Sequence, residues 1–567
     1  MHEETHRREF LGSLAMLGAA GGSTAIVPSA IAAAALSQGA SDGSITAATV
    51  AEAEKFAGIP FTAAERAQIA RTIGDQIEAF KARGAFGAID NQLAPAQVFR
   101  VLLPGEAPAT RAVRAGTAAS GAAAPSGDDA LDWATVAQLG QWMRDGKVTS
   151  RRLVERSIAR LARSRGKLNH VITLVGEPAL AEADALDAEA RAGRWRGPLH
   201  GIPYGLKDLF DTAGIATTWG AEPWRDRVPA DDATVVKRLR DAGAVCVAKT
   251  AVGALAYGDI WFGGTCRNPW NAEQGSSGSS AGSASAVAAG CVPFAIGTET
   301  LGSIVSPSVR CGTTGLRPTF GRVPRDGAMA LCWSWDKVGP ITRSVRDTGL
   351  VLEAINGGND LDASSVSMPF VAPSAGEAKG LRVAFDPAWF EGPAAALRNA
   401  LDAARDSGMV LVERTFAPPC DPSVLVTSLM CEAAAAFEEM TRSGADDTLS
   451  WQADEAWPNS FRRTWFVPGI ELVQAERVRR AFMRWMRTAL EGVDALILPP
   501  FAGGFLYITN ATGHPQLVLR AGFDAPAQPR SISLIGHPFD EATLLCAGMA
   551  IESRLAVAEK RPEMPWM

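Results

Sequence analysis

Residues 275–285 read Gly-Ser-Ser-Gly-Ser-Ser-Ala-Gly-Ser-Ala-Ser, and the interpretation of the whole sequence depends on this stretch. Its composition is typical of a flexible linker, but its flanks are not linker-like. Asn268-Pro269-Trp270 precedes it, and an apolar, strand-like run at 294–297 follows. Glycines and serines between such flanks favour a tightly packed loop whose amides and hydroxyls approach a ligand.

One catalytic motif lies inside this stretch, because Gly278-Ser279-Ser280-Ala281-Gly282 matches GxSxG. This pattern is typical of the nucleophile elbow of α/β-hydrolases, in which Ser280 would attack and His514 or His537 would act as the base. An elbow directly follows an apolar strand, and Asn271-Ala272-Glu273-Gln274 is not apolar. The elbow is therefore a disfavoured alternative, although it stays open at this point.

Composition excludes several classes of protein. The chain has 567 residues, of which 47% are hydrophobic and 20% charged, so it can bury a large core and is not a disordered protein. A net charge of −6 provides no basic footprint for nucleic acid. The six histidines lack metal-ligand spacing and the eight cysteines form no CxxC pair. We therefore expect no metal or other cofactor, and reduced, mostly buried cysteines.

Apolar periodicity divides the chain after its first residues into three parts. Residues 46–104 are predicted to form a small N-terminal helical unit, with a capping box at Thr62-Ala-Ala-Glu65. Residues 105–128 are rich in Ala, Gly, Ser and Pro and are typical of a flexible linker. From 129 to 567, helical stretches alternate with short apolar runs, which predicts one large α/β domain with a central sheet covered by helices.

The N-terminus has the layout of an export signal. Arg7-Arg8-Glu9-Phe10-Leu11 precedes a stretch without charged residues that continues to Asp42, with small residues around Ala30-Ile31-Ala32. The string resembles the twin-arginine signal of bacteria, so residues 1–35 are predicted to be a cleaved signal peptide and the protein periplasmic or secreted. An uncleaved membrane anchor is the alternative, which the many Gly and Ser residues disfavour.

Two further segments contain candidate catalytic groups. Ser303 follows a glycine-bearing turn within Gly297–Val305, where a hydroxyl can lie beside free backbone N–H groups. Lys207 is an isolated lysine among apolar residues in Gly201-Ile-Pro-Tyr-Gly-Leu-Lys207-Asp208, and burial would make it a candidate base. The simpler interpretations are a satisfied turn serine and a surface lysine paired with Asp208.

Together these segments resemble the amidase signature family of Ser-Ser-Lys amide hydrolases. The resemblance covers roughly 131 to the end of the chain, and a spaced set of motifs is more specific than any single one. The matching residues are Gly201–Asp208, Asn268-Pro269-Trp270, Gly278–Ser283, Gly302-Ser303-Ile304, Cys311-Gly312, Gly315-Leu316-Arg317-Pro318-Thr319, Thr512-Gly-His-Pro515 and Phe539-Asp-Glu-Ala-Thr543.

The resemblance implies a mixed central sheet covered by helices and a role for each matching residue. Lys207 would be the base, Ser279 a bridging serine preceded by a cis peptide bond, and Ser303 the nucleophile. The backbone N–H groups of Thr300, Leu301, Gly302 and Ser303 would form the oxyanion hole. Because Lys207 must be neutral to accept a proton, we expect burial to depress its pKa strongly. The resemblance assigns no substrate-binding residues.

Three departures from the family pattern concern the surroundings of this trio. Leu301 replaces a glycine, Val305 replaces an arginine that usually supports the loop, and Ser277 replaces the first glycine of a Gly-Gly pair. These departures affect the shape of the substrate site and the support of the loop, because Lys207, Ser279 and Ser303 are all present.

The resemblance implies hydrolysis of a linear carboxylic, aryl or peptide amide to an acid and ammonia or an amine, through a serine acyl-enzyme. One alternative is a glutaminase like the A subunit of the glutamyl-tRNA amidotransferase, and another is a non-catalytic binding protein on the same fold. The expected partner is a small-molecule amide. We expect no binding of nucleic acid and no membrane association beyond the export signal, and a homodimer is a possible assembly.

Overall fold

The computed structural model describes residues 45–83, 87, 89–108, 125–392, 394–524, 528–557 and 559–567. The predicted signal peptide at 1–35 and most of the predicted linker, residues 109–124, lie outside the described residues. The chain divides into two compact units, Met1–Gly87 and Ala88–Met567.

The first unit contains three short helices, α3 (Ala47–Ala57), α4 (Ala63–Thr72) and α5 (Gly74–Arg83). The predicted capping box at the start of α4 is present, since Thr62 and Glu65 exchange hydrogen bonds. An ion pair of 2.7 Å between Glu54 and Arg66 joins α3 to α4.

The predicted end of the helical unit at residue 104 is wrong. The helices end at Arg83, and residues 89–104 form no helix and belong to the second unit. Pro95 and Pro104 interrupt this segment, and a proline inside a helix removes a backbone donor and clashes with the preceding turn.

The second unit is built on one mixed sheet of eleven strands among the described residues, in the order β1-β3-β2-β8-β10-β9-β14-β15-β13-β11-β12. Strand β2 is parallel to both β3 and β8, and β11 is parallel to β12 and β13, whereas the other pairs are antiparallel. The strands are β1 (Val171–Leu174), β2 (Pro203–Lys207), β3 (Val245–Thr250), β8 (Phe294–Glu299), β9 (Thr314–Arg317), β10 (Lys337–Thr342), β11 (Arg382–Phe385), β12 (Val410–Glu413), β13 (Ala495–Leu498), β14 (Gln516–Asp524) and β15 (Gln528–Gly536).

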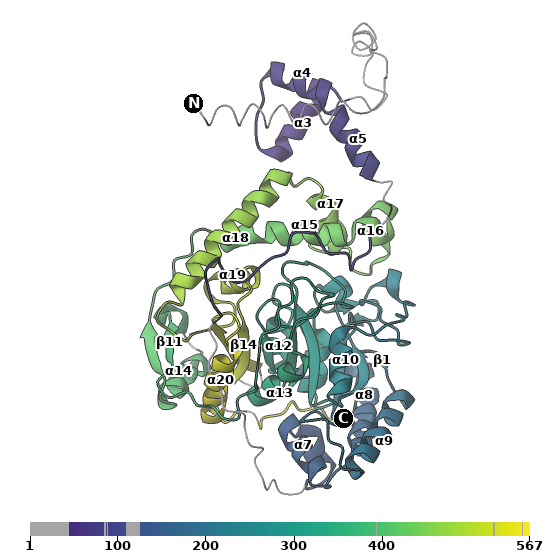
Figure 1. Ribbon diagram of the computed structural model, residues 1–567, viewed down its shortest axis with the longest axis vertical. Helices are drawn as coiled ribbons and strands as arrows, with labels where there is room; N and C mark the ends of the chain where they lie inside the picture. Colours follow the sequence, from purple (N-terminus) through teal and green to yellow (C-terminus); the bar gives the residue numbers. More distant parts are fainter. Residues whose placement is uncertain are drawn as a thin grey trace. The chain divides into compact units, whose positions relative to one another are not determined.

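Helices cover this sheet, and two small hairpins lie outside it (Figure 1). The hairpins are β4 (Ile260–Trp261) with β5 (Gly264–Thr265), and β6 (Arg267–Asn268) with β7 (Asn271–Gly275). The helices are α6 (Asp128–Trp133), α7 (Val136–Arg144), α8 (Ser150–Leu168), α9 (Glu177–Arg191), α10 (Thr234–Asp241), α11 (Ala281–Ala288), α12 (Val305–Cys311), α13 (Val345–Ile355), α14 (Ala395–Asp406), α15 (Val426–Ala436), α16 (Glu438–Ser443), α17 (Trp457–Thr464), α18 (Gly469–Ala489), α19 (Phe505–Thr512) and α20 (Glu541–Leu555).

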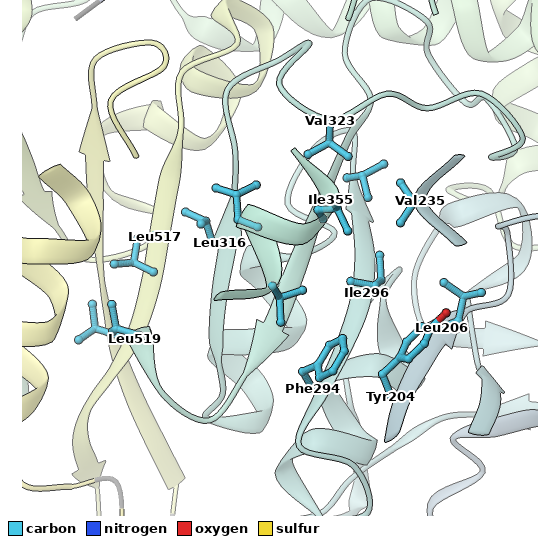
Figure 2. Close-up of a cluster of buried hydrophobic side chains, with 14 of the residues drawn as sticks. Tyr204, Leu206, Val235, Phe294, Ile296, Leu316, Val323, Ile355, Leu517 and Leu519 are labelled. Carbon is cyan, nitrogen blue, oxygen red and sulfur yellow. The ribbon is translucent and has the colours of Figure 1, made fainter. Parts of the chain in front are cut away.

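The core follows the central strands, whose side chains are buried on both faces of the sheet. All six residues of β8 are buried, as expected for a strand covered by helices on both sides. Figure 2 shows Tyr204 of β2 beside Phe294 of β8, and their rings stack with centroids 5.3 Å apart. Leu517 and Leu519 of β14 belong to the same apolar cluster.

The serine-glycine stretch is a buried helix and its entry loop, which explains its composition. Every residue of α11 is buried. A Cβ atom at Gly282 would lie 2.3 Å from both the amide nitrogen of Ala251 and the carbonyl oxygen of His170. Small residues are therefore required where α11 meets β3, and the stretch is not a linker.

All eight cysteines lie in the described residues and are free, and five of them are buried. This agrees with the expectation of reduced cysteines. None of the described helices combines the length and the apolar character that a membrane crossing requires.

Candidate active site

Lys207 is the last residue of β2 and its side chain is fully buried. Its Nζ lies 2.8 Å from Ser279 Oγ, 2.8 Å from Thr298 Oγ1 and 3.3 Å from the Thr298 carbonyl oxygen. Because β2 and β8 are parallel neighbours, their carboxyl ends meet at the same edge of the sheet, which brings Lys207 beside Thr298. The amine therefore contacts three uncharged oxygen atoms.

Burial lowers the pKa of the Lys207 amine from its usual value to about 7, although the charges of Asp336 and Glu299 oppose this shift. The surface ion pair with Asp208 is not formed. Asp208 instead accepts hydrogen bonds from Thr218 and lies 3.3 Å from the Nζ of Lys249. The expected depression of the Lys207 pKa is thus present, and desolvation is its cause.

Ser279 and Ser280 have different surroundings. The Gly278–Ser279 peptide bond is cis, as the family resemblance implied, and the Ser279 hydroxyl contacts Lys207. Ser280 Oγ donates to the carbonyl of Thr298 at 3.1 Å and accepts from its N–H at 3.2 Å. The Ser280 N–H donates to the Ser303 carbonyl at 3.1 Å, which joins the two serine loops.

The histidines of the elbow alternative have other partners. His514 Nδ1 lies 2.8 Å from Thr512 Oγ1, and His537 Nε2 lies 2.8 Å from the Val493 carbonyl oxygen. Both line a small cavity of about 80 Å³ that does not include Ser280. A nucleophile elbow centred on Ser280 therefore has neither its base nor a free hydroxyl.

Thr300–Ser303 form a loop between β8 and α12. Gly302 has a φ of +86°, a left-handed conformation that glycine adopts without steric cost. Within the described part of the chain, the N–H groups of Thr300, Leu301, Gly302 and Ser303 have no hydrogen-bond acceptor. Consecutive free N–H groups beside a serine hydroxyl can stabilise a developing negative charge on oxygen.

The buried carboxylate of Glu299 supports this loop. Its Oε2 accepts from the N–H groups of Ile304 and Val305 at 2.8 and 2.9 Å. Its Oε1 accepts from Arg317 at 2.7 Å and from Asn510 at 2.8 Å. The positive charges of Arg317 and Lys337, with these hydrogen bonds, hold the pKa of Glu299 below its usual value.

The three departures from the family pattern have identifiable surroundings. Leu301 is partly buried against an apolar cluster and lines the pocket beside Ser303. Val305 contributes its backbone N–H to Glu299 but no side-chain charge. Arg317 supplies the positive charge beside that carboxylate. Ser277 has a φ of +60°, and its N–H donates to Asp259 at 2.8 Å while its Oγ lies 2.9 Å from Ser306 Oγ.

A pocket of about 1120 Å³ opens at Ser303. Its walls include Gly278 and the loop Thr300–Ser303. Its apolar lining consists of Ala256, Leu301, Leu331, Val426, Leu429, Met430 and Leu506. Its polar and aromatic lining includes Tyr257, Asp259, Arg310, Asp454, Glu455, Trp457 and Arg463.

The structure brings Lys207 and Ser279 into contact and places Ser303 in the neighbouring loop, whereas several residues that surround them were not predicted. Thr298 contacts Lys207, and Asp336 Oδ1 accepts from Thr300 Oγ1 at 2.6 Å. No motif in the sequence links these residues to the site. In the part of the chain that the structure describes, no group of three or more His, Cys, Asp or Glu side chains could hold a metal ion.

Comparison with known proteins agrees with this geometry. The Amidase family model matches residues 152–545, and the chain belongs to this family. The A subunit of the glutamyl-tRNA(Gln) amidotransferase from Anaeromyxobacter dehalogenans is 33% identical over 473 residues, covering 73% of this chain and 95% of that protein.

Two solved structures resemble the second unit. Native peptide amidase of Stenotrophomonas maltophilia is 30% identical with a TM-score of 0.67, covering 76% of this chain and 98% of that one. A bacterial aryl acylamidase of the amidase signature family is 21% identical with a TM-score of 0.66, covering 76% and 99%, which shows the shared fold. The protein is thus an amidase-family enzyme that hydrolyses amide bonds.

The conformation of Gly302 gives a first prediction. A Cβ atom here would lie 3.2 Å from Leu506 Cδ2, and alanine disfavours a φ of +86°. We expect Gly302→Ala to lower amidase activity at least tenfold, about 1.4 kcal/mol in the activation barrier, because the loop must shift. Steady-state hydrolysis rates measure the effect.

Gly380→Ala is the matched control, because Gly380 has a φ of +82° and open space around its Cα. Both variants should lose a similar free energy of unfolding in urea, while only Gly302→Ala loses activity. Equal activity of the two variants would contradict the role of the loop conformation.

Proposed function

We propose that the protein hydrolyses linear carboxylic, aryl or peptide amides through a serine acyl-enzyme, with Lys207 as base, Ser279 as bridging serine and Ser303 as nucleophile. The contact of 2.8 Å between Lys207 Nζ and Ser279 Oγ carries this proposal. A buried lysine with no carboxylate on its amine is rare unless its neutral form has a use.

The hydrogen bonds of Lys207 suit a neutral amine. Such an amine has two N–H groups and one lone pair. As an ammonium, Lys207 Nζ donates to Ser279 Oγ, Thr298 Oγ1 and the Thr298 carbonyl. In the proposed neutral form, two N–H groups donate to the Thr298 oxygens and the lone pair accepts the Ser279 hydroxyl across the same 2.8 Å contact. Ser279 can then accept the proton of Ser303 while it gives its own proton to Lys207.

Ser303 Oγ attacks the amide carbonyl carbon, and the N–H groups of Thr300–Ser303 stabilise the oxyanion. The proton returns from Lys207 through Ser279 to the leaving nitrogen, and the C–N bond breaks as the amine departs. Water then attacks the acyl-enzyme with the same groups acting as base, releasing the acid and restoring Ser303.

The lining of the pocket supports an apolar acyl group in the substrate. Leu301, where the family usually has glycine, adds an aliphatic side chain directly before Gly302 and Ser303. Burying a Leu-sized apolar group in such a site contributes about 1.5–3 kcal/mol to binding. Amides with branched aliphatic or aryl acyl groups are therefore the proposed substrates, in preference to acetamide.

The alternative role is that of the glutamyl-tRNA amidotransferase A subunit, which is the role named for relatives with 33% identity. Charged side chains such as Arg310 and Glu455 line part of the pocket, but the aliphatic side chain of Leu301 next to Ser303 favours an apolar acyl group over the polar side chain of glutamine. A non-catalytic binding protein on the same fold has no need of a lysine amine held against a serine hydroxyl. We therefore favour hydrolysis of linear carboxylic, aryl or peptide amides over both alternatives.

We further propose that the protein is exported to the periplasm or secreted. The twin-arginine-like string at Arg7-Arg8 and the stretch without charged residues that continues to Asp42 support this proposal. Charged tRNA is cytoplasmic, so export also disfavours the amidotransferase role.

Replacing each serine tests the assignment of the nucleophile. Ser303→Ala should lower turnover of an amide panel by about 10³-fold or more, because the attacking oxygen is lost. Ser280→Ala should retain most activity, since its hydroxyl is bonded to Thr298. Release of ammonia or amine is the measurement. Wild-type turnover by Ser303→Ala, or loss confined to Ser280→Ala, would refute the proposed trio.

The pH profile tests the base. Lys207 acts in its neutral form, so kcat/KM should rise with pH, about tenfold per unit below pH 7, and level off above its pKa of about 7. Lys207→Arg should abolish activity at every pH, because guanidinium stays protonated. A profile without this rise between about pH 5 and 9, or wild-type activity in Lys207→Arg, contradicts the role.

Export is tested by replacing Arg7-Arg8 with Lys-Lys. Twin-arginine export depends on the arginine pair, so the precursor should remain inside the cell, while charge and hydrophobicity are unchanged. Immunoblots of cytoplasmic and periplasmic fractions measure the distribution. Unchanged export of the Lys-Lys variant would exclude the twin-arginine route.

A further inference from the structure

Residues 89–108, here named the strap, precede the part of the chain that the family model matches. The strap forms no helix or strand and belongs to the second unit. It runs as a dark segment along α15 and α18 in Figure 1. At α18, the Arg479 guanidinium lies 3.6 Å from the centre of the Phe99 ring, and Val101 and Leu103 are buried.

The start of the strap is bonded to the backbone of the loop 327–336. Asn91 Nδ2 donates to the Ala330 carbonyl at 2.9 Å, and Asn91 Oδ1 accepts from the Ala330 N–H at 2.8 Å. Gln92 Nε2 donates to the Ala328 carbonyl at 2.9 Å, and Gln92 Oε1 accepts from the Gly327 N–H at 3.1 Å. Two adjacent side-chain amides therefore form paired hydrogen bonds with the backbone of this loop, as a neighbouring strand would.

A fifth hydrogen bond completes this attachment. The indole Nε1 of Trp333 donates to the Asn91 carbonyl oxygen at 3.2 Å. Among the described residues, the N–H and carbonyl of Ala330 form hydrogen bonds only with the Asn91 side chain. Removing that side chain leaves both groups without a protein partner, which costs about 1–3 kcal/mol for each group that stays buried.

The loop 327–336 reaches the proposed active site at two points. Leu331, the neighbour of Ala330, lines the substrate pocket. The N–H groups of Leu331 and Cys332 donate to Asp336 Oδ2 at 2.8 and 2.9 Å, while Asp336 Oδ1 accepts from Thr300 Oγ1. Asn91 is thus linked through Ala330, Leu331 and Asp336 to the loop Thr300–Ser303, here named the oxyanion loop after its proposed role.

We propose that Asn91 and Gln92 are positioning residues. They fix the position of Leu331 in the pocket wall that contacts the acyl group and, through Asp336, the position of Thr300 in the oxyanion loop. This inference rests on the proposed function for its effect on catalysis, but the hold of the strap on the loop is independent of it. The segment before the family-matched region thereby contributes to acyl-group selection.

The test combines two measurements on the full chain. The variants are Asn91→Ala, the isosteric Asn91→Asp, and Asn91→Ala with Gln92→Ala; Gln97→Ala is the control, since Gln97 is an exposed strap amide. Hydrogen exchange reports on the amides of Ala330 and Leu331. Rates of hydrolysis of a branched aliphatic amide and of acetamide report on acyl-group selection. Both rates are normalised to the number of active sites that a serine-reactive fluorophosphonate labels.

We expect faster exchange at Ala330 and Leu331 in all three variants. We expect kcat/KM for the branched aliphatic amide to fall about tenfold, which is less than the roughly 100-fold that a misplacement of about 1 Å can cost. This loss should be at least threefold larger than the loss for acetamide. Asn91→Asp should change both measurements in the same direction as Asn91→Ala, because its carboxylate repels the Ala330 carbonyl even though it can still accept from the Ala330 N–H. Gln97→Ala should match the wild type in both measurements.

Wild-type exchange at Ala330 and Leu331 in the double variant would overturn the proposal, as would equal losses for both amides after normalisation. Wild-type behaviour of Asn91→Asp in both measurements would also overturn the proposal, and so would a change in either measurement in the Gln97→Ala control. If the wild type hydrolyses no amide at all, the proposed function fails, whereas the exchange measurement still decides whether the strap holds the loop.

Discussion

The structure around the site depends on one constraint, which is that no carboxylate among the described residues pairs with the buried amine of Lys207. Three carboxylates lie near it in the fold, and each has partners elsewhere. Asp208 pairs with Lys249, Glu299 pairs with Arg317, and Asp336 accepts from Thr300 and two backbone N–H groups. A direct ion pair with any of them would favour the charged amine and raise its pKa.

The buried ion pair of Glu299 with Arg317 serves the same constraint, because it keeps the Glu299 carboxylate from pairing with Lys207. Both side chains are fully buried, and a buried ion pair adds little net stability over apolar packing. Its value lies in geometry, because the carboxylate accepts the N–H groups of Ile304 and Val305 directly after Ser303. The pair therefore fixes the backbone of the oxyanion loop while its own charge is neutralised.

The alternation of helical and apolar segments predicted the α/β class, and the family resemblance implied the mixed sheet, the cis peptide bond before Ser279 and the contact between Ser279 and Lys207. The boundary at residue 104 was missed because composition alone does not distinguish a linker from a segment bonded to a distant loop. Asn91 and Ala330 are 239 residues apart, and their contact is a property of the tertiary structure. Thr298 and Asp336 were missed for the same reason.

The departures from the family pattern now separate into two kinds. The loop does not need an arginine at position 305, because Arg317 and Asn510 already fill the acceptor sites of Glu299 Oε1. Leu301 has no such compensation and adds its side chain to the pocket. Since the backbone N–H of residue 301 is present with either glycine or leucine, this substitution changes the shape of the pocket and keeps the N–H group on which the proposed oxyanion stabilisation depends.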